Sequence, residues 1–175
     1  MVVEETAILQ AAEQEGWNEQ KLKEVMGNIL MISKDQDPTS EALRAYFPSA
    51  MEYEASNVFP FSSERKYSGA SFCEQGTYLI GAQQFLFPDG NRELEQICGT
   101  YTASGYRVLV LAWSPACLDD PELPSDLEPK ALLLLSDVIR KDARETLEFF
   151  ARQGVECRIL TGDDAVTAAH IAEKA

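Results

Sequence analysis

Histidine is almost absent from this chain, and its four cysteines are scattered. His170 is the only histidine, so neither a histidine-based catalytic triad nor a histidine-rich metal site is predicted. The cysteines show no pair spacing typical of a zinc site or a redox motif; they are Cys73, Cys98, Cys117 and Cys157. A reducing compartment is the simpler interpretation, because unpaired thiols persist where glutathione keeps them reduced.

Long apolar runs and an excess of basic residues are also missing. No apolar run approaches the roughly 20 residues that cross a bilayer, and the acidic start at residues 1–10 is unlike a signal peptide. The chain has 15 Lys and Arg residues against 29 Asp and Glu residues, which gives a net charge of −14. These features argue against membrane insertion of this chain, and against nucleic acid or an anionic membrane surface as a direct partner.

Residues 1–128 carry a pattern of helices and short strands. The chain has 175 residues, of which 45% are hydrophobic, enough for one core or one core and a small appendage. The spacing from Leu22 to Leu30 predicts an amphipathic helix that starts near Asn18, and a second helix is expected at residues 92–103. Glycine-punctuated apolar runs between residues 58 and 87 predict antiparallel strands, and residues 106–113 predict another. We therefore expect an antiparallel sheet flanked by helices, with a domain boundary near residue 128 in a proline-rich acidic connection.

The last part of the chain has a different layout. Two apolar runs, at residues 132–135 and 157–160, are each followed by an aspartate, and a helix capped by Gly154 is expected between them. A continuous apolar run is typical of a strand buried on both faces of a parallel sheet. Residues 129–175 thus predict an incomplete Rossmann-like βαβα unit, and the whole chain is expected to be of the α+β class.

The two aspartates of that unit, Asp137 and Asp163, are candidates for a phosphate-handling site. They are expected at the carboxyl edge of the parallel sheet, where α/β folds bind ligands on loops and helix N-termini. Thr161 and Gly162 suit such a loop, and a carboxylate beside them can hold Mg²⁺ together with phosphate oxygens. Alternatively, both aspartates serve only as helix N-caps.

A second candidate site lies upstream, where residues 59–67 read FPFSSERKY. An aromatic face such as that of Phe61 can stack on adenine, while Arg65 and Lys66 can attract phosphate. Stacking of a base on an aromatic ring contributes roughly 1–3 kcal/mol. Alternatively, Phe61 is a core residue of a hairpin and the two basic residues lie on a solvated strand face.

Taken together, these segments resemble the P-type cation-transporting ATPases. Residues 137–147 (DVIRKDARETL) and 154–172 (GVECRILTGDDAVTAAHIA) are similar to the family's hinge and phosphorylation domain, and FPFSSERKY is similar to its nucleotide-domain signature Phe-Ser-x-x-Arg-Lys. The resemblance implies that Asp137 and Arg140 lie at the hinge. It also implies that Thr161, Gly162 and Asp163 lie near the transferring phosphoryl group.

Three further segments extend the resemblance over a nucleotide pocket. Residues 37–43 (DPTSEAL) look like the family's helix start, residues 78–82 (YLIGA) look like the strand before its Lys-Gly-Ala loop, and residues 105–112 (GYRVLVLA) look like a strand whose arginine reaches the phosphates. The residues implied to bind nucleotide are Thr39, Ser40, Phe61, Ser62, Arg65, Lys66, Gly81, Ala82 and Arg107, with Asp137 and Arg140 from the hinge. Either Thr39 or Ser40 is expected to cap its helix. Ile80 stands where many members carry lysine, so ATP binding is expected to be weak.

Two signatures of the family are missing. Neither Asp-Lys-Thr-Gly-Thr, which contains the phosphorylated aspartate, nor Gly-Asp-Gly-x-Asn-Asp occurs here. The resemblance implies a piece of a pump on the cytoplasmic side of a membrane: a nucleotide-binding domain at 1–128 and part of a phosphorylation domain at 129–175. Its expected partners are ATP with Mg²⁺ and the rest of the pump, namely the phosphorylation, actuator and membrane domains. The pump would couple ATP hydrolysis to ion transport through an aspartyl phosphate, whereas the piece would bind ATP without hydrolysing it.

Two other interpretations stay open. Residues 35–39 satisfy Asp-x-Asp-x-Thr, the motif of haloacid-dehalogenase-like phosphatases, with Asp35 as nucleophile, Asp37 as general acid/base and Thr161 binding phosphate. That motif should follow a buried strand, whereas the spacing before it is helical. The other interpretation is an acidic interaction module that binds a protein partner and no nucleotide.

Overall fold

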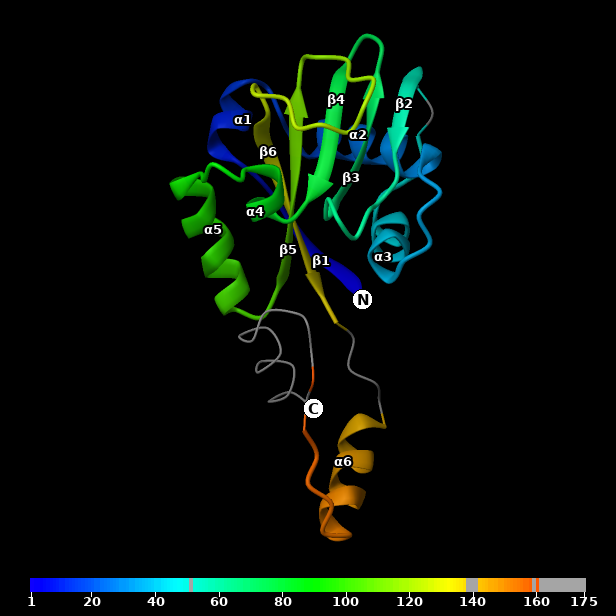
Figure 1. Ribbon diagram of the computed structural model, residues 1–175, viewed down its shortest axis with the longest axis vertical. Helices are drawn as coiled ribbons and strands as arrows, with labels where there is room; N and C mark the ends of the chain where they lie inside the picture. Colours follow the sequence, from blue (N-terminus) through cyan, green and yellow to red (C-terminus); the bar gives the residue numbers. More distant parts are fainter. Residues whose placement is uncertain (51, 138–141, 159, 161–175) are drawn as a thin grey trace.

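The computed structural model describes residues 1–50, 52–137, 142–158 and 160, and its centre is a six-stranded sheet (Figure 1). The strands are β1 (Val2–Ile8), β2 (Ala55–Phe59), β3 (Tyr67–Phe72), β4 (Gly76–Gly81), β5 (Arg107–Ser114) and β6 (Glu128–Ser136). They lie in the order β1-β6-β5-β4-β3-β2, and each neighbouring pair is antiparallel.

Helices cover both faces of this sheet. The helices near the sheet are α1 (Gln10–Gln14), α2 (Glu19–Ile32), α3 (Pro38–Tyr46), α4 (Gln83–Leu86) and α5 (Arg92–Ala103), and a further helix, α6 (Ala143–Arg152), follows the last strand. One hydrophobic cluster joins the sheet to α2 and α3, and a second joins its other face to α4 and α5. Figure 1 shows α4 and α5 in front of the sheet and α2 behind it. The predicted antiparallel sheet flanked by helices is therefore confirmed.

The two longest helices of the sheet region begin where their sequence predicts. The side chain of Asn18 accepts a hydrogen bond of 2.9 Å from the amide of Lys21 and so caps α2. Asn91 caps α5 in the same way, through the amide of Leu94. Each side chain satisfies a backbone donor that the first helical turn leaves unpaired.

The strand at residues 132–135 does not belong to a parallel sheet, and that prediction is wrong. It lies within β6, which pairs with β1 on one side and β5 on the other, both antiparallel. Leu132, Leu133, Leu134 and Leu135 are fully buried because helices cover both faces of this sheet. A strand buried on both faces has the same continuous apolar run in either type of sheet. The sheet consequently extends to Ser136, past residue 128 where the boundary was predicted.

Strand β1 is an edge strand that the sequence pattern does not predict. It pairs with β6, and the register shifts between Val3 and Glu5. Such an irregularity interrupts the alternation of inward and outward residues. Glu4 and Glu5 are exposed on this edge, where charged side chains discourage pairing with another chain.

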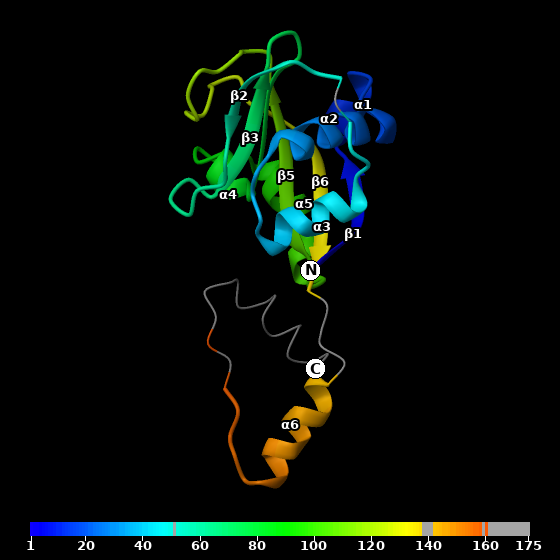
Figure 2. The ribbon, with the colours of Figure 1, turned by 90° about the vertical axis from the view of Figure 1, so that its right-hand side faces the viewer.

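Helix α6 confirms the helix expected after residue 142, and it lies apart from the sheet (Figures 1 and 2). Gly154 follows it with a φ of +72°, a conformation that glycine adopts without steric cost. None of the residues of α6 is buried. Of the strand predicted at 157–160, the three described residues have no regular secondary structure. The predicted site residues Arg140, Thr161, Gly162 and Asp163 lie outside the described residues.

Over the part of the chain that the structure describes, no helix combines the length and apolar character needed to span a bilayer.

Candidate functional site

A step in the sheet creates a pocket. Strand β4 ends at Gly81, which pairs with Val110 of β5, whereas β5 begins three residues earlier at Arg107. Residues 107–109 therefore continue beyond the last residue of β4 while they still pair with β6 on their other side. Side chains from both faces of β5 can reach the space beside this free edge.

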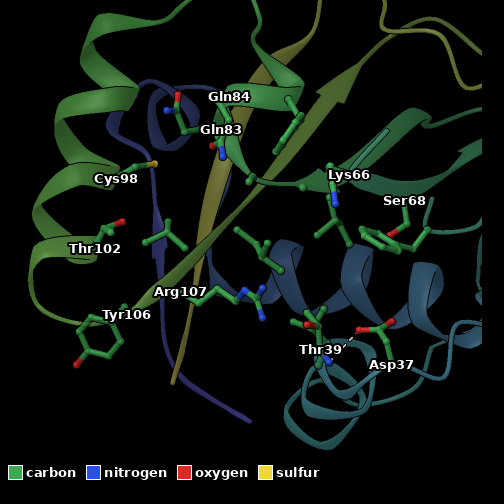
Figure 3. A pocket seen from close by; sticks show the side chains of 18 of the residues that line it. Asp37, Thr39, Lys66, Ser68, Gln83, Gln84, Cys98, Thr102, Tyr106 and Arg107 are labelled. Atoms are coloured by element: carbon green, nitrogen blue, oxygen red, sulfur yellow. Dashed lines mark hydrogen bonds between the residues drawn. The ribbon is translucent and has the colours of Figure 1, made fainter. Parts of the chain in front are cut away.

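The pocket at this step has a volume of about 620 Å³, within the range typical of small-molecule sites. It is bounded by the start of α3, the loop before β3, the end of β4, helices α4 and α5, and the start of β5. Its polar and aromatic lining includes Asp37, Thr39, Ser40, Phe61, Lys66, Ser68, Gln83, Gln84, Glu95, Thr102, Tyr106, Arg107 and Asp137. Segments that are distant in sequence thus converge on one cavity (Figure 3).

One wall of the pocket is the loop between β2 and β3. It contributes Phe61, a residue that is 49% exposed, and Lys66. Lys66 has a φ of +63°, a left-handed conformation that costs a non-glycine residue about 1–3 kcal/mol. Its amide donates a 2.7 Å hydrogen bond to the Ser62 carbonyl, which closes the turn. The loop therefore presents an open aromatic face and an ammonium group to the same cavity.

The opposite wall contains Arg107 and the start of α3. Figure 3 shows the Arg107 side chain extending from β5 toward Thr39 and Asp37. The predicted cap of α3 is wrong: Asp37 is the N-cap, and its carboxylate accepts hydrogen bonds from the amides of Thr39 and Ser40 at 2.9 and 3.2 Å. Asp37 takes this role because Pro38 follows it at the first helical position. Thr39 and Ser40 line the pocket from the first turn instead.

The cap makes the stability of this wall depend on pH. Burial alone would raise the pKa of Asp37, but hydrogen bonds from the Ser40 hydroxyl and from the Ser40 and Thr39 amides outweigh it and lower the pKa below its ordinary 3.8. A carboxyl with a lowered pKa contributes stability that is complete above the unfolded-state value and is lost as the pH falls through the folded-state value.

We expect Asp37→Ala to lower the free energy of unfolding by about 1 kcal/mol at pH 7, as other N-cap removals do. Asp37→Asn keeps a capping oxygen without a titrating group. The difference in stability between wild type and Asp37→Asn should stay constant above about pH 5 and change in favour of the variant below pH 4. Urea unfolding from pH 7 to pH 2 measures it, and a difference that remains constant to pH 2 would contradict this role of Asp37.

Two predicted ligands lie elsewhere. Among the described residues, Ser62 and Arg65 are outside the pocket lining. The Ser62 hydroxyl accepts hydrogen bonds from the amides of Glu64 and Arg65. The guanidinium of Arg65 donates to the Pro60 carbonyl at 2.9 Å and lies 5.9 Å from the centre of the Tyr67 ring. Both side chains therefore shape the loop that carries Phe61.

The end of β4 contributes Ile80, Gly81 and Ala82 to the pocket. A Cβ atom on Gly81 would lie 2.7 Å from the Cβ of Tyr67 and 3.0 Å from the Lys66 carbonyl oxygen. This glycine is thus required for the close approach of β3 to β4, whatever the pocket binds. Ile80 is only 6% exposed and packs in the core beneath α2 and α3 as well as lining the cavity.

Helix α5 forms a side of the pocket that no sequence motif predicts. Cys98, Gly99 and Thr102 line it, and the spacing of Cys98 and Thr102 places them on one helix face. The only sequence feature that could have indicated this side of the pocket is the spacing of these small residues on one helix face. Burial raises the pKa of the Cys98 thiol to about 11, so this group stays protonated at neutral pH.

Residues 35–37 of the Asp-x-Asp-x-Thr motif lie in the loop between α2 and α3, and its last two residues begin α3. Asp35 thus follows a helix, and not the buried strand that the phosphatase interpretation requires. Asp37 is engaged as a helix cap. The structure contradicts that interpretation.

Comparison with known proteins finds several related ion-transporting ATPases. The chain is 35% identical over 167 residues to the probable cation-transporting ATPase exp7 of Streptococcus pneumoniae, with 92% of the chain and 20% of that protein covered. It is 31% identical over 159 residues to the calcium-transporting ATPase CtpE of Mycobacterium bovis, and 34% identical over 146 residues to CtpE of Mycolicibacterium smegmatis. These alignments cover 89% and 82% of the chain. The chain spans about a fifth of the length of these relatives.

The fold is also found in solved structures. A crystal structure of a zinc-transporting PIB-type ATPase superposes with a TM-score of 0.59 at 18% identity, over 99% of this chain and 25% of that one. A second crystal structure of a zinc-transporting PIB-type ATPase, in a different state, gives a TM-score of 0.54. No protein-family model matches the chain.

Proposed function

Because this chain belongs to the family of P-type cation-transporting ATPases, we propose that it is the part of such a pump that binds ATP. The observation that carries the proposal is that Phe61, Lys66 and Arg107, which come from separate segments, line one cavity of about 620 Å³. The complete pump would couple ATP hydrolysis to cation transport through an aspartyl phosphate. This chain would lie on the cytoplasmic side of the membrane, where ATP is available.

The three side chains would contact different parts of the nucleotide. Phe61 offers a half-exposed ring on which adenine stacks, a contact worth roughly 1–3 kcal/mol. Arg107 and Lys66 supply positive charge for the phosphates, and a hydrogen bond to a charged group contributes about 1.5–3 kcal/mol. Ile80, in the place where many family members carry lysine, supplies no such bond, so we propose that binding is weak.

Charge balance supports a magnesium nucleotide as the ligand. The pocket lining contains the carboxylates Asp37, Glu95 and Asp137 beside its two cations, and the chain carries a net charge of −14. A free ATP anion would meet repulsion from this environment. Magnesium on the phosphates reduces that charge, and an exposed carboxylate such as Asp137 at the pocket is a ligand type that the ion accepts.

The chain by itself is proposed to bind ATP without turning it over. It contains no Asp-Lys-Thr-Gly-Thr segment to supply the aspartate that receives the phosphoryl group. Hydrolysis would require the rest of the pump, which would contribute the phosphorylation, actuator and membrane domains.

We expect Phe61→Ala to weaken MgATP binding by roughly 5- to 150-fold, since it removes a stacking contact of about 1–3 kcal/mol. Amide chemical shifts followed during an MgATP titration give the affinity even when it is weak. Phe149→Ala is the matched control, because Phe149 on α6 is 53% exposed and is not part of the pocket lining. It should leave the affinity unchanged.

The same titration distinguishes the alternatives. Shifts around Phe61, Gly81 and Arg107 that saturate with MgATP support the nucleotide site. Saturating MgATP without shifts at these residues would contradict the proposal and favour the acidic interaction module. Equal losses of MgATP affinity in Phe61→Ala and Phe149→Ala would contradict binding of MgATP in this pocket.

A further inference from the structure

The loop between α2 and α3 is tied to the aromatic wall of the pocket through Asp35. Both carboxylate oxygens of Asp35 accept a hydrogen bond from the backbone amide of Phe61, at 3.2 and 3.1 Å. Phe61 itself lies in the loop between β2 and β3, 26 residues away in sequence. The ring proposed to stack on adenine is therefore attached at its own backbone to a side chain from another segment.

Asp35 is in turn held firmly in place. The Ser33 hydroxyl donates to its carboxylate at 3.1 Å, and its own amide donates back to that hydroxyl. From α3, Arg44 donates to the backbone carbonyls of Asp35 and Ser33 at 2.7 and 3.0 Å. These contacts fix the backbone on both sides of the carboxylate, so the position of Phe61 is set by α2 and α3.

We infer that Asp35 is a positioning residue for nucleotide binding, which holds the Phe61 ring in the orientation that adenine stacking requires. The inference rests on the proposed function. Phe61 has a side chain that is half exposed, so core packing alone does not fix it. A hydrogen bond from an amide to a carboxylate is among the stronger hydrogen bonds, and it acts next to the Cα atom from which the ring projects.

This inference gives the Asp-x-Asp-x-Thr segment a role without phosphatase chemistry. Asp35 fixes the aromatic wall, and Asp37 caps α3, whose first turn carries Thr39 and Ser40 into the opposite wall. Each aspartate holds backbone amides of the pocket lining, and neither acts as a nucleophile. Ligands that do not contact the Phe61 ring should consequently bind with the same affinity when Asp35 is replaced.

The test compares MgATP with magnesium tripolyphosphate, a probe that has the phosphates without the adenine. We expect Asp35→Ala to weaken MgATP binding by about tenfold while tripolyphosphate binding at Lys66 and Arg107 changes by less than about twofold. Asp35→Asn retains an oxygen that can accept from the Phe61 amide, and it should recover most of the MgATP affinity. Affinities come from amide shifts during titration, and the Phe61 amide proton should move upfield in Asp35→Ala as its hydrogen bond is lost.

Each outcome separates the inference from the proposed function. If wild type does not bind MgATP, the proposed function fails and the inference fails with it. If wild type binds MgATP and both Asp35 variants bind it as tightly as wild type does, only the inference is overturned. Equal losses of MgATP and tripolyphosphate in Asp35→Ala would also overturn it, because they would mean general loosening of the fold. If Asp35→Ala does not fold, Ser33→Ala takes its place, because it removes the hydroxyl that orients the Asp35 carboxylate; it should weaken MgATP binding more than tripolyphosphate binding, and equal changes for the two ligands would overturn the inference.

Discussion

Gly69→Ala is expected to lower the free energy of unfolding by at least about 3 kcal/mol, the upper part of the range for overpacked sites. A Cβ atom on Gly69 would lie 2.1 Å from the carbonyl oxygen of Tyr78 and 2.8 Å from a methyl carbon of Leu79. The oxygen belongs to the backbone of β4, so no side-chain rotation relieves the contact. Strand β3 would have to move away from β4 in the middle of the sheet.

Gly99→Ala is the matched control for this change. Gly99 lies within α5, and a Cβ atom there would have no heavy atom within 4 Å. Alanine loses less backbone entropy than glycine when a helix forms, so this variant should gain about 0.5–1 kcal/mol. Urea unfolding at constant slope compares the two midpoints. A Gly69→Ala protein as stable as wild type would contradict the close approach of β3 and β4.

Local signals in the sequence were sufficient for the elements with strong periodicity. Helices α2 and α5 combine a capping asparagine with an amphipathic pattern, and both begin where these signals predict. Strand β1 was missed because its pattern is interrupted at the irregular pairing near Glu5, and its partner β6 is over a hundred residues away. Strand β6 was recognised as a buried strand but assigned to the wrong sheet, since burial on both faces does not reveal the direction of its neighbours.

Some features of the candidate site could likewise be predicted from the sequence, and others could not. Resemblance to a family identified Phe61, Lys66, Gly81 and Arg107, which the structure brings to one cavity. It gave no indication of the step between β4 and β5 that forms the cavity, because a register is a property of the paired strands. Asp35 could not be recognised as a partner of Phe61, since its contact is with a backbone amide and leaves no pattern of residue types.

The second large loss of stability is expected when both carboxylate partners of the buried Lys130 ammonium group are replaced. Lys130 at the start of β6 has a side chain that is 2% exposed, and it forms salt bridges with Glu128, at 2.5 Å, and with Glu15 just after α1. Its ammonium group also lies 5.0 Å from the centre of the Trp113 ring. We expect Glu15→Gln combined with Glu128→Gln to lower the free energy of unfolding by about 1–3 kcal/mol, because it leaves the Lys130 charge without a counter-ion; the loss is smaller than for a fully buried pair because both carboxylates are about half exposed.

Lys130→Met separates this charge effect from packing. Methionine keeps most of the apolar stem over Trp113 and removes the charge, and replacing a buried ion pair by apolar residues is often close to neutral. Lys130→Met should therefore be less destabilised than the double glutamine variant, and adding it to that variant should restore stability. Thermal and urea unfolding measure both comparisons. Equal losses in Lys130→Met and the double variant would assign the effect to packing against Trp113.

The pH dependence at alkaline pH gives an independent test. Burial alone would lower the pKa of Lys130, but hydrogen bonds to Glu128 and Glu15, with their charges, outweigh it and raise the pKa above its ordinary 10.5. In wild type this stabilising contribution is complete below pH 10.5 and is lost as the pH rises through the folded-state pKa. In the double glutamine variant the two negative charges that raise the pKa are gone and burial dominates, so we expect the folded-state pKa to fall below the unfolded one and stability to increase with pH as it approaches 10.5. The slope of stability against pH should thus have opposite signs in the two proteins, which a loss of packing alone would not produce.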